Sequence, residues 1–302
     1  MAKSRGRKSH SNTRAVSRSG DPRRRAMAQK VAEQIDPVQR AAARVGGITA
    51  AVAPSDPMQL PTLLPLFIDM VATVNLAPAE RCLDDCMTLV HAYAQLGIPA
   101  QVRAVELTVT NTSTKSSVTH GSLTPRWEDD MIHGHTVVWL PTLEHLVDVT
   151  AEQFAEIAAL DDGPIIAGHR GPRLSGNAPI SIKVKRKDLL LTYTLASMPT
   201  SAALLDHPVP HAEAENYRRR GINVASAAVK ILASSLPPGS TRLIPHKRAA
   251  ALVEAVRELP EHLTPTEDQR FLLPGPDGEH VVAQLDEIPL PPGTPLAAEP
   301  NS

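Results

Sequence analysis

The spacing of apolar and polar residues predicts a helix followed by a strand in the middle of the chain. Apolar positions between 82 and 96 are separated by 4, 3, 1, 3 and 3 residues, which fits one buried helical stripe. We expect this helix to begin near Pro78 or Glu80 and to end at Gly97. From 101 to 110 the period becomes two, as expected for a strand. The stripe consists of Cys82, Cys86, Leu89, Val90, Tyr93 and Leu96.

Two further strands are predicted at 136–140 and 143–149, with His135 directly before the first. Thr150 follows them with Gln153 three residues later, the pattern of a helix capping box. Val149 and Phe154 would form the hydrophobic staple of that helix. These signals place Asp148 at the end of a strand, just before a helix N-terminus.

The remaining pattern alternates between helices and hairpins, which indicates an α+β protein. The Ser-, Thr- and Asn-rich segment 110–124 is predicted to be a loop or flap. A hairpin is expected over 180–195, around the polar turn 185–188, and another around 274–278. Further helices are expected at 27–35, 37–46, 63–74, 212–234 and 247–259.

Composition divides the 302 residues into three parts. Residues 1–26 form a basic, Ser-rich arm that we expect to be disordered, and 27–236 form the α+β domain. In 237–302, 12 of 66 residues are Pro, which predicts a partly disordered extension whose last dozen residues are unstructured. The Ala, Pro and Arg bias is typical of a bacterial genome of high GC content.

The net charge of −1 hides an asymmetry. Residues 1–25 carry nine Lys/Arg and one Asp, a charge of +8, so the remainder carries −1 − 8 = −9. The arm is compatible with weak binding to nucleic acid or anionic lipid through phosphate contacts. Because the arm has no aromatic residues, we favour a solubilising tail, or a true start at Met27.

The two cysteines, Cys82 and Cys86, are too close in sequence to join distant segments by a disulfide. No secretory segment or apolar run of membrane-spanning length is present, so we expect a cytoplasmic protein without a membrane partner.

Cys82, His135 and Asp148 are the residue types of a thiol nucleophile, its base and the group that orients the base. Burial of both thiols in the core is the alternative, because free cysteine is often buried. A metal site formed by Cys82, Cys86, His133 and His135 is a further alternative, although this spacing is uncommon for zinc. We therefore expect no metal or other cofactor.

The segment from Cys82 to Gly97-Ile98-Pro99-Ala100 resembles the nucleophile helix of the transglutaminase-like superfamily. His135 in GHTVVWL and Asp148 in VDVT stand in the family's second block, in the order Cys, His, Asp. The resemblance implies a papain-like core, with the nucleophile helix packed on an antiparallel sheet. It implies a cysteine hydrolase or acyltransferase acting on a peptide or amide.

In the mechanism implied by the resemblance, the backbone N–H of Cys82 would hold the oxyanion, and Asn75 is a candidate for the second donor. A catalytically inactive interaction module of the same fold, and a nucleic-acid-associated protein that uses the arm, remain alternatives.

Overall fold

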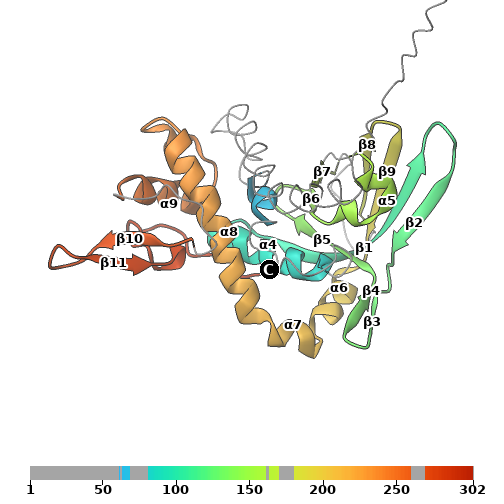
Figure 1. Ribbon diagram of the computed structural model, residues 1–302, viewed down its shortest axis with the longest axis horizontal. Coiled ribbons are helices and arrows are strands. Elements are labelled where there is room, and N and C mark those ends of the chain that lie inside the picture. The colour runs from blue at the N-terminus through green and yellow to red at the C-terminus, as the bar shows by residue number, and fades with distance from the viewer. Residues whose placement is uncertain are drawn as a thin grey trace, which may run out of the picture.

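The computed structural model describes residues 61, 63–68, 81–160, 163–169, 180–259 and 269–301, with the elements labelled in Figure 1. It combines helices with antiparallel strands, so the predicted α+β class is confirmed. The large sheet lies on one side, and α9 (Lys247–Arg257) lies on the other with a small hairpin (Figure 1). Between them lie α4 (Cys82–Gln95) and α8 (Ala214–Ser235). In these residues, no helix combines the length and apolar character needed to cross a bilayer.

The large sheet has the strand order β7-β6-β5-β1-β9-β8, and β2 pairs with β1 outside this path. Its pairings are antiparallel. Strands β7 and β8 also contact each other, so the sheet curls until its two ends meet. The strands are β1 (Gln101–Asn111), β2 (Ser117–Gly121), β5 (His135–Leu140), β6 (His145–Asp148), β7 (Ile165–Gly168), β8 (Ser181–Arg186) and β9 (Leu189–Leu195).

Strand β1 changes its partner along one edge, and this change creates the point where β5 begins. Val105 lies opposite His135 of β5, whereas the next residue, Glu106, lies opposite Gly121 of β2. Gly121 has a φ of +74°, and a Cβ there would lie 2.3 Å from the Val105 oxygen and 2.9 Å from the His135 Cβ. Glycine is therefore needed for β2 to end against His135.

The two faces of the sheet belong to two separate hydrophobic clusters. Because neighbouring residues of a strand point to opposite faces, Val138 packs against the helical layer while Trp139 packs into the second cluster. The second cluster also contains Tyr193 of β9. It is covered by the 3₁₀-helix η3 (Ala151–Gln153) and by α5 (Ala155–Ala158).

Helix α4 (Cys82–Gln95) packs against α8 (Ala214–Ser235) through a close approach at Gly221. A Cβ at Gly221 would lie 2.5 Å from the His91 Cβ and 2.8 Å from the Thr88 oxygen. The apolar stripe predicted for α4 is buried along its whole length, and Gly97 adopts the left-handed conformation expected after a helix end.

The C-terminal segment differs from the expectation of a disordered end. Asn301 donates its backbone N–H to the Ala100 oxygen, and its side-chain oxygen accepts from the backbone of Val102. This segment contains η4 (Ser240–Leu243), α9 (Lys247–Arg257), β10 (Phe271–Pro274), β11 (His280–Ala283) and η5 (Leu285–Glu287). Side chains of α9, β10 and η5 belong to the same core cluster as α4.

The predicted loop over 110–124 is wrong, because this segment contains β2, which pairs with β1. Its Ser and Thr residues suit an exposed strand, so polarity alone was misleading. The sequence pattern also missed β3 (Arg126–Glu128), β4 (Met131–His133), α6 (Met198–Leu205) and α7 (Pro208–Ala212). The arm at 1–26 and the helices predicted at 27–35 and 37–46 lie outside the described residues. Of the helix predicted at 63–74, the described part contains η1 (Leu64–Phe67).

Candidate active site

Two of the three predicted site residues form a buried pair at the ends of neighbouring strands. As predicted, β5 begins at His135 and β6 ends at Asp148. The two side chains are 1% and 0% exposed, and His135 Nε2 lies 2.8 Å from Asp148 Oδ2. A carboxylate only accepts hydrogen bonds, so Nε2 carries a hydrogen and donates a hydrogen bond to Asp148.

Asp148 receives two further hydrogen bonds, which fix its carboxylate. The hydroxyl of Tyr193 donates to Oδ2 at 3.0 Å, and the backbone N–H of Thr150 donates to Oδ1 at 3.1 Å. Buried carboxylates are costly without such donors. Tyr193 lies in β9 and reaches Asp148 because the sheet curls, a contact that sequence spacing could not reveal.

The second nitrogen of His135 is also occupied. Gln153 Nε2 lies 3.1 Å from His135 Nδ1 and 3.2 Å from Thr150 Oγ1. The imidazole and the Phe154 ring are nearly perpendicular, at 84°, with centroids 5.1 Å apart. The ring of His135 is therefore held at both nitrogens and by contact with Phe154.

The capping box predicted for Thr150 and Gln153 is wrong. A 3₁₀-helix starts after Thr150 without a side-chain cap, and Phe154 is extended, with a φ of −92° and a ψ of 123°. The side chain of Gln153 contacts His135 and the Thr150 hydroxyl, whereas the backbone N–H of Thr150 donates to Asp148 instead of to Gln153. A buried imidazole offers a hydrogen bond that the local sequence does not encode, and this tertiary contact prevails.

Cys82 is the first residue of α4 and is 5% exposed. Burial alone would lower the pKa of His135. The charge and hydrogen bond of Asp148, with smaller contributions from a hydrogen bond and the charge of Cys82, outweigh it and raise the pKa of His135 to about 10. The thiol of Cys82 thus lies close enough to the imidazole held by Asp148 to influence the pKa of that imidazole.

Cys86 lies one turn further along α4, in a different environment. It is fully buried in the core cluster that contains Leu89 and Val90. Burial, and to a smaller extent the charge of Cys82, raise the pKa of the Cys86 thiol well above its ordinary value. Cys86 is therefore suited to packing rather than to attack.

The metal alternative gains no support from the described residues, in which no group of three or more His, Cys, Asp or Glu could hold an ion. His133 points into the β3–β4 hairpin, where its Nε2 lies 2.8 Å from Glu128 Oε2, and its side chain is 52% exposed. Asn75, the candidate second oxyanion donor, lies outside the described residues.

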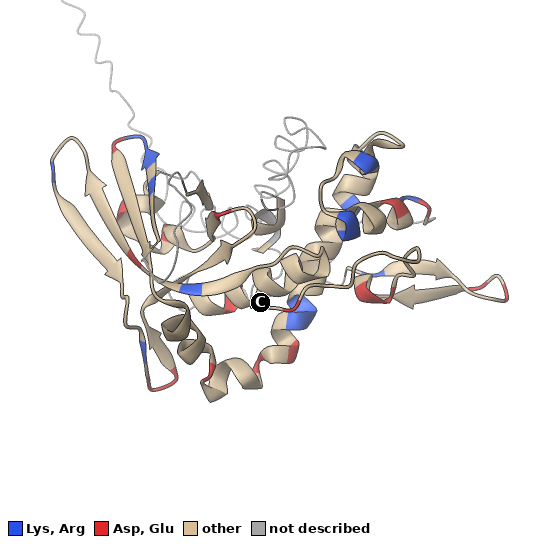
Figure 2. Ribbon diagram, turned by 180° about the vertical axis from the view of Figure 1, so that it is seen from behind, with Lys and Arg blue, Asp and Glu red and all other residues tan. Residues whose placement is uncertain are grey.

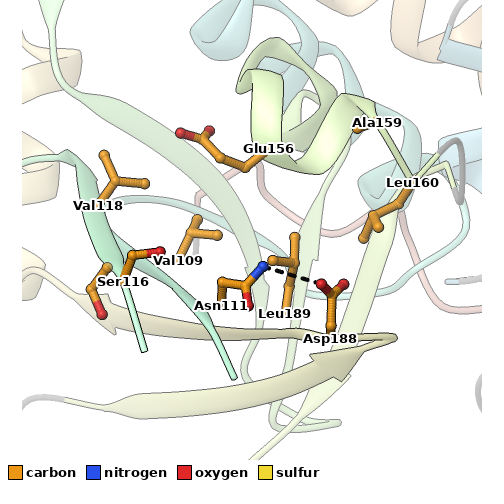
Figure 3. A pocket seen from close by; sticks show the side chains of 10 residues that line it. Val109, Asn111, Ser116, Val118, Glu156, Ala159, Leu160, Asp188 and Leu189 are labelled. Carbon is orange, nitrogen blue, oxygen red and sulfur yellow. Dashed lines mark hydrogen bonds between the residues drawn. The ribbon is translucent and has the colours of Figure 1, made fainter. Parts of the chain in front are cut away.

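A stack of side chains links the His135–Asp148 pair to a surface pocket. The His120 ring of β2 stacks on Phe154 with centroids 4.0 Å apart, and its Nε2 lies 3.4 Å from Glu156 Oε2. Glu156 in turn lines an open pocket of about 420 Å³ between α5 and the β1–β2 hairpin. Figure 3 shows apolar walls, including Val109 and Leu160, beside the Asn111–Asp188 hydrogen bond.

Comparisons with protein-family models, curated proteins and solved structures gave no match for this chain. The resemblance to the transglutaminase-like superfamily therefore remains a prediction from Cys82, the motif at 97–100, His135 and Asp148.

Proposed function

We propose that this protein is a cysteine hydrolase or acyltransferase that acts on a peptide or amide. Cys82 would be the nucleophile, His135 the acid and base, and Asp148 the group that orients His135. One observation carries the proposal: the buried imidazole 2.8 Å from Asp148 lies close enough to the thiol at the start of α4 for that thiol to contribute to its raised pKa. A papain-like core of the transglutaminase-like kind, suggested by the order of these residues, is part of the proposal.

The first half-reaction uses the imidazolium form of His135, which its raised pKa of about 10 favours at neutral pH. The Cys82 thiolate attacks the carbonyl carbon, forming a carbon–sulfur bond and an oxyanion. As the tetrahedral intermediate collapses, the carbon–nitrogen bond breaks and the leaving amine takes the proton from His135. Asp148 keeps the ring aligned throughout, because its hydrogen bond to Nε2 is present before and after the transfer.

The second half-reaction releases the acyl group from Cys82. Water or an amine gives a proton to His135 and attacks the thioester, and the Cys82 thiolate leaves. The backbone N–H of Cys82 is suited to hold the oxyanion, because the first N–H groups of a helix have no acceptor within it. The helix N-terminus also favours negative charge at this position.

The alternative of an inactive module with the same three residues is favoured by one observation. His135 and Asp148 are 1% and 0% exposed, and Gln153 already contacts the second imidazole nitrogen. In that case the network would serve stability, and Cys82 would react no faster than an ordinary thiol.

The nucleic-acid alternative depends on the basic arm, which lies outside the described residues. In the described part, Lys and Arg occur on α8, on α9 and near strand turns, intermixed with Asp and Glu (Figure 2). This distribution does not by itself favour phosphate binding. Salt-sensitive DNA binding that disappears on deletion of residues 1–26 would support the alternative, and no binding by the intact chain would end it.

Site-resolved alkylation of the full chain tests the enzymatic proposal. At pH 7 we expect iodoacetamide to label Cys82 about tenfold faster than a free thiol, because a free thiol is only a few per cent thiolate at this pH. Cys82→Ala should abolish fast labelling.

Cys86→Ala is the matched control, one turn further along the same helix, and it should leave fast labelling intact. If fast labelling survived Cys82→Ala and disappeared with Cys86→Ala, the reactive thiol would be Cys86 and the assignment of Cys82 would be wrong. Ordinary reactivity at both cysteines would favour the inactive module.

A further inference from the structure

The His135 nitrogen that must exchange a proton with Cys82 is contacted by an amide. Nε2 is committed to Asp148 at 2.8 Å, so Nδ1 is the nitrogen left for the thiol. Gln153 Nε2 lies 3.1 Å from that same Nδ1. The proposed proton transfer therefore takes place next to the Gln153 amide.

An amide can serve Nδ1 in both of its states. Neutral His135 presents a lone pair at Nδ1, which accepts a hydrogen bond from the Gln153 NH₂ group. Imidazolium presents an N–H there, which can donate to the Gln153 carbonyl oxygen. A rotation of the amide by 180° exchanges its NH₂ group and its carbonyl oxygen. The Thr150 hydroxyl, 3.2 Å away, can accept from the NH₂ group or donate to the oxygen.

We propose that Gln153 is a positioning residue of the candidate site, whose amide holds His135 at Nδ1 in either protonation state and leaves Nδ1 to Cys82 while the proton is transferred. This inference rests on the proposed function for the thiol step, but the contact with His135 is independent of it. Leucine at 153 would leave the Nδ1–H of the imidazolium without this acceptor. Glutamate would supply a charged acceptor at the same place.

Other groups around His135 also influence its titration. The charged and titratable side chains around it come from several elements. Helix α4 contributes Cys82 and Cys86, β6 contributes Asp148, and β9 contributes Tyr193. Behind Phe154 lie His120 of β2 and Glu156 of α5. None of them is altered by substitution at 153, so a shift in the titration of His135 can be assigned to the amide.

The test is a pH titration of the His135 ring nitrogens by ¹⁵N NMR in the full chain, with His135→Gln used for assignment. The amide bonds the charged ring more strongly than the neutral ring, and a difference of about 1 kcal/mol corresponds to about 0.7 pKa unit. We expect Gln153→Leu to lower the pKa of His135 by about that amount and Gln153→Glu to raise it.

Glu152→Leu is the matched control on the same 3₁₀-helix. The Glu152 side chain accepts from the backbone of Gly163, so its loss should destabilise the segment without moving the titration of His135. An unchanged titration in folded Gln153→Leu or Gln153→Glu would overturn the proposal.

The same titration in Cys82→Ser separates this inference from the proposed function. A shift caused by Gln153→Leu in that background would support positioning by Gln153 even if Cys82 proves unreactive. Where Cys82 is reactive, Gln153→Leu should also move the pH profile of its alkylation, and a purely structural role would not move it.

Discussion

The helical layer and the neighbouring strand ends are both buried, but they are held together by different interactions. Between α4 and α8, apolar side chains and the close contact at Gly221 exclude water, and the Tyr217 hydroxyl of α8 donates to Asp84 of α4. At the strand ends, His135 and Asp148 are buried and their polar atoms meet Tyr193 and Gln153. In the first region removing volume is costly, whereas in the second removing a partner is costly. Substitutions should therefore separate stability from thiol chemistry.

The largest effect is expected for Asp148→Ala. This change leaves a buried imidazole without its carboxylate, and breaking a buried pair in this way costs about 3–5 kcal/mol. Urea unfolding should show the loss, and the accelerated alkylation of Cys82 should disappear with it. A loss below about 1 kcal/mol would mean that the pair contributes little to the fold.

Leu89→Ala should have a comparable or smaller effect of a different kind. Leu89 is fully buried on α4, and truncation of such a residue costs about 2–5 kcal/mol through lost burial and the remaining cavity. Because Leu89 is not a partner of His135, the alkylation rate of Cys82 should remain unchanged where the variant is folded. A parallel loss of reactivity would show that the two regions are coupled.

The smallest effect is a pH dependence of stability. The pKa of His135 is about 10 in the folded chain, against an ordinary value of 6.5. The stabilisation of the fold by protonated His135 is therefore fully present below pH 6.5 and is lost as the pH rises through about 10. From pH 7 to 8 the loss is at most ~1.4 kcal/mol, equivalent to one proton. Unfolding free energies should show this slope in the native chain and a smaller slope in Asp148→Asn; equal slopes would contradict it.

The sequence predicted the elements better than the contacts between them. Alternation located β1 and β6, and a run of residues that favour strands located β5; these signals placed His135 at a strand start and Asp148 at a strand end. Period and turn signals depend on neighbouring residues, so they report local structure.

Contacts that depend on the curl of the sheet were not predictable in this way. Tyr193 meets Asp148 from 45 residues away, and Gln153 carries a helix-cap signal that its contact with His135 overrides. The C-terminal segment was likewise misjudged from its Pro content, because Asn301 is held by hydrogen bonds to Ala100 and Val102 that no periodicity reveals.

The central claim is that His135, held by Asp148, activates Cys82. Its most direct test is the alkylation rate at Cys82 in the native chain and in His135→Gln, measured by peptide mass spectrometry at pH 7. Loss of the imidazolium should slow Cys82 by about tenfold, to the rate of an ordinary thiol, and leave Cys86 unchanged. The same rate at Cys82 with and without His135 would contradict the account.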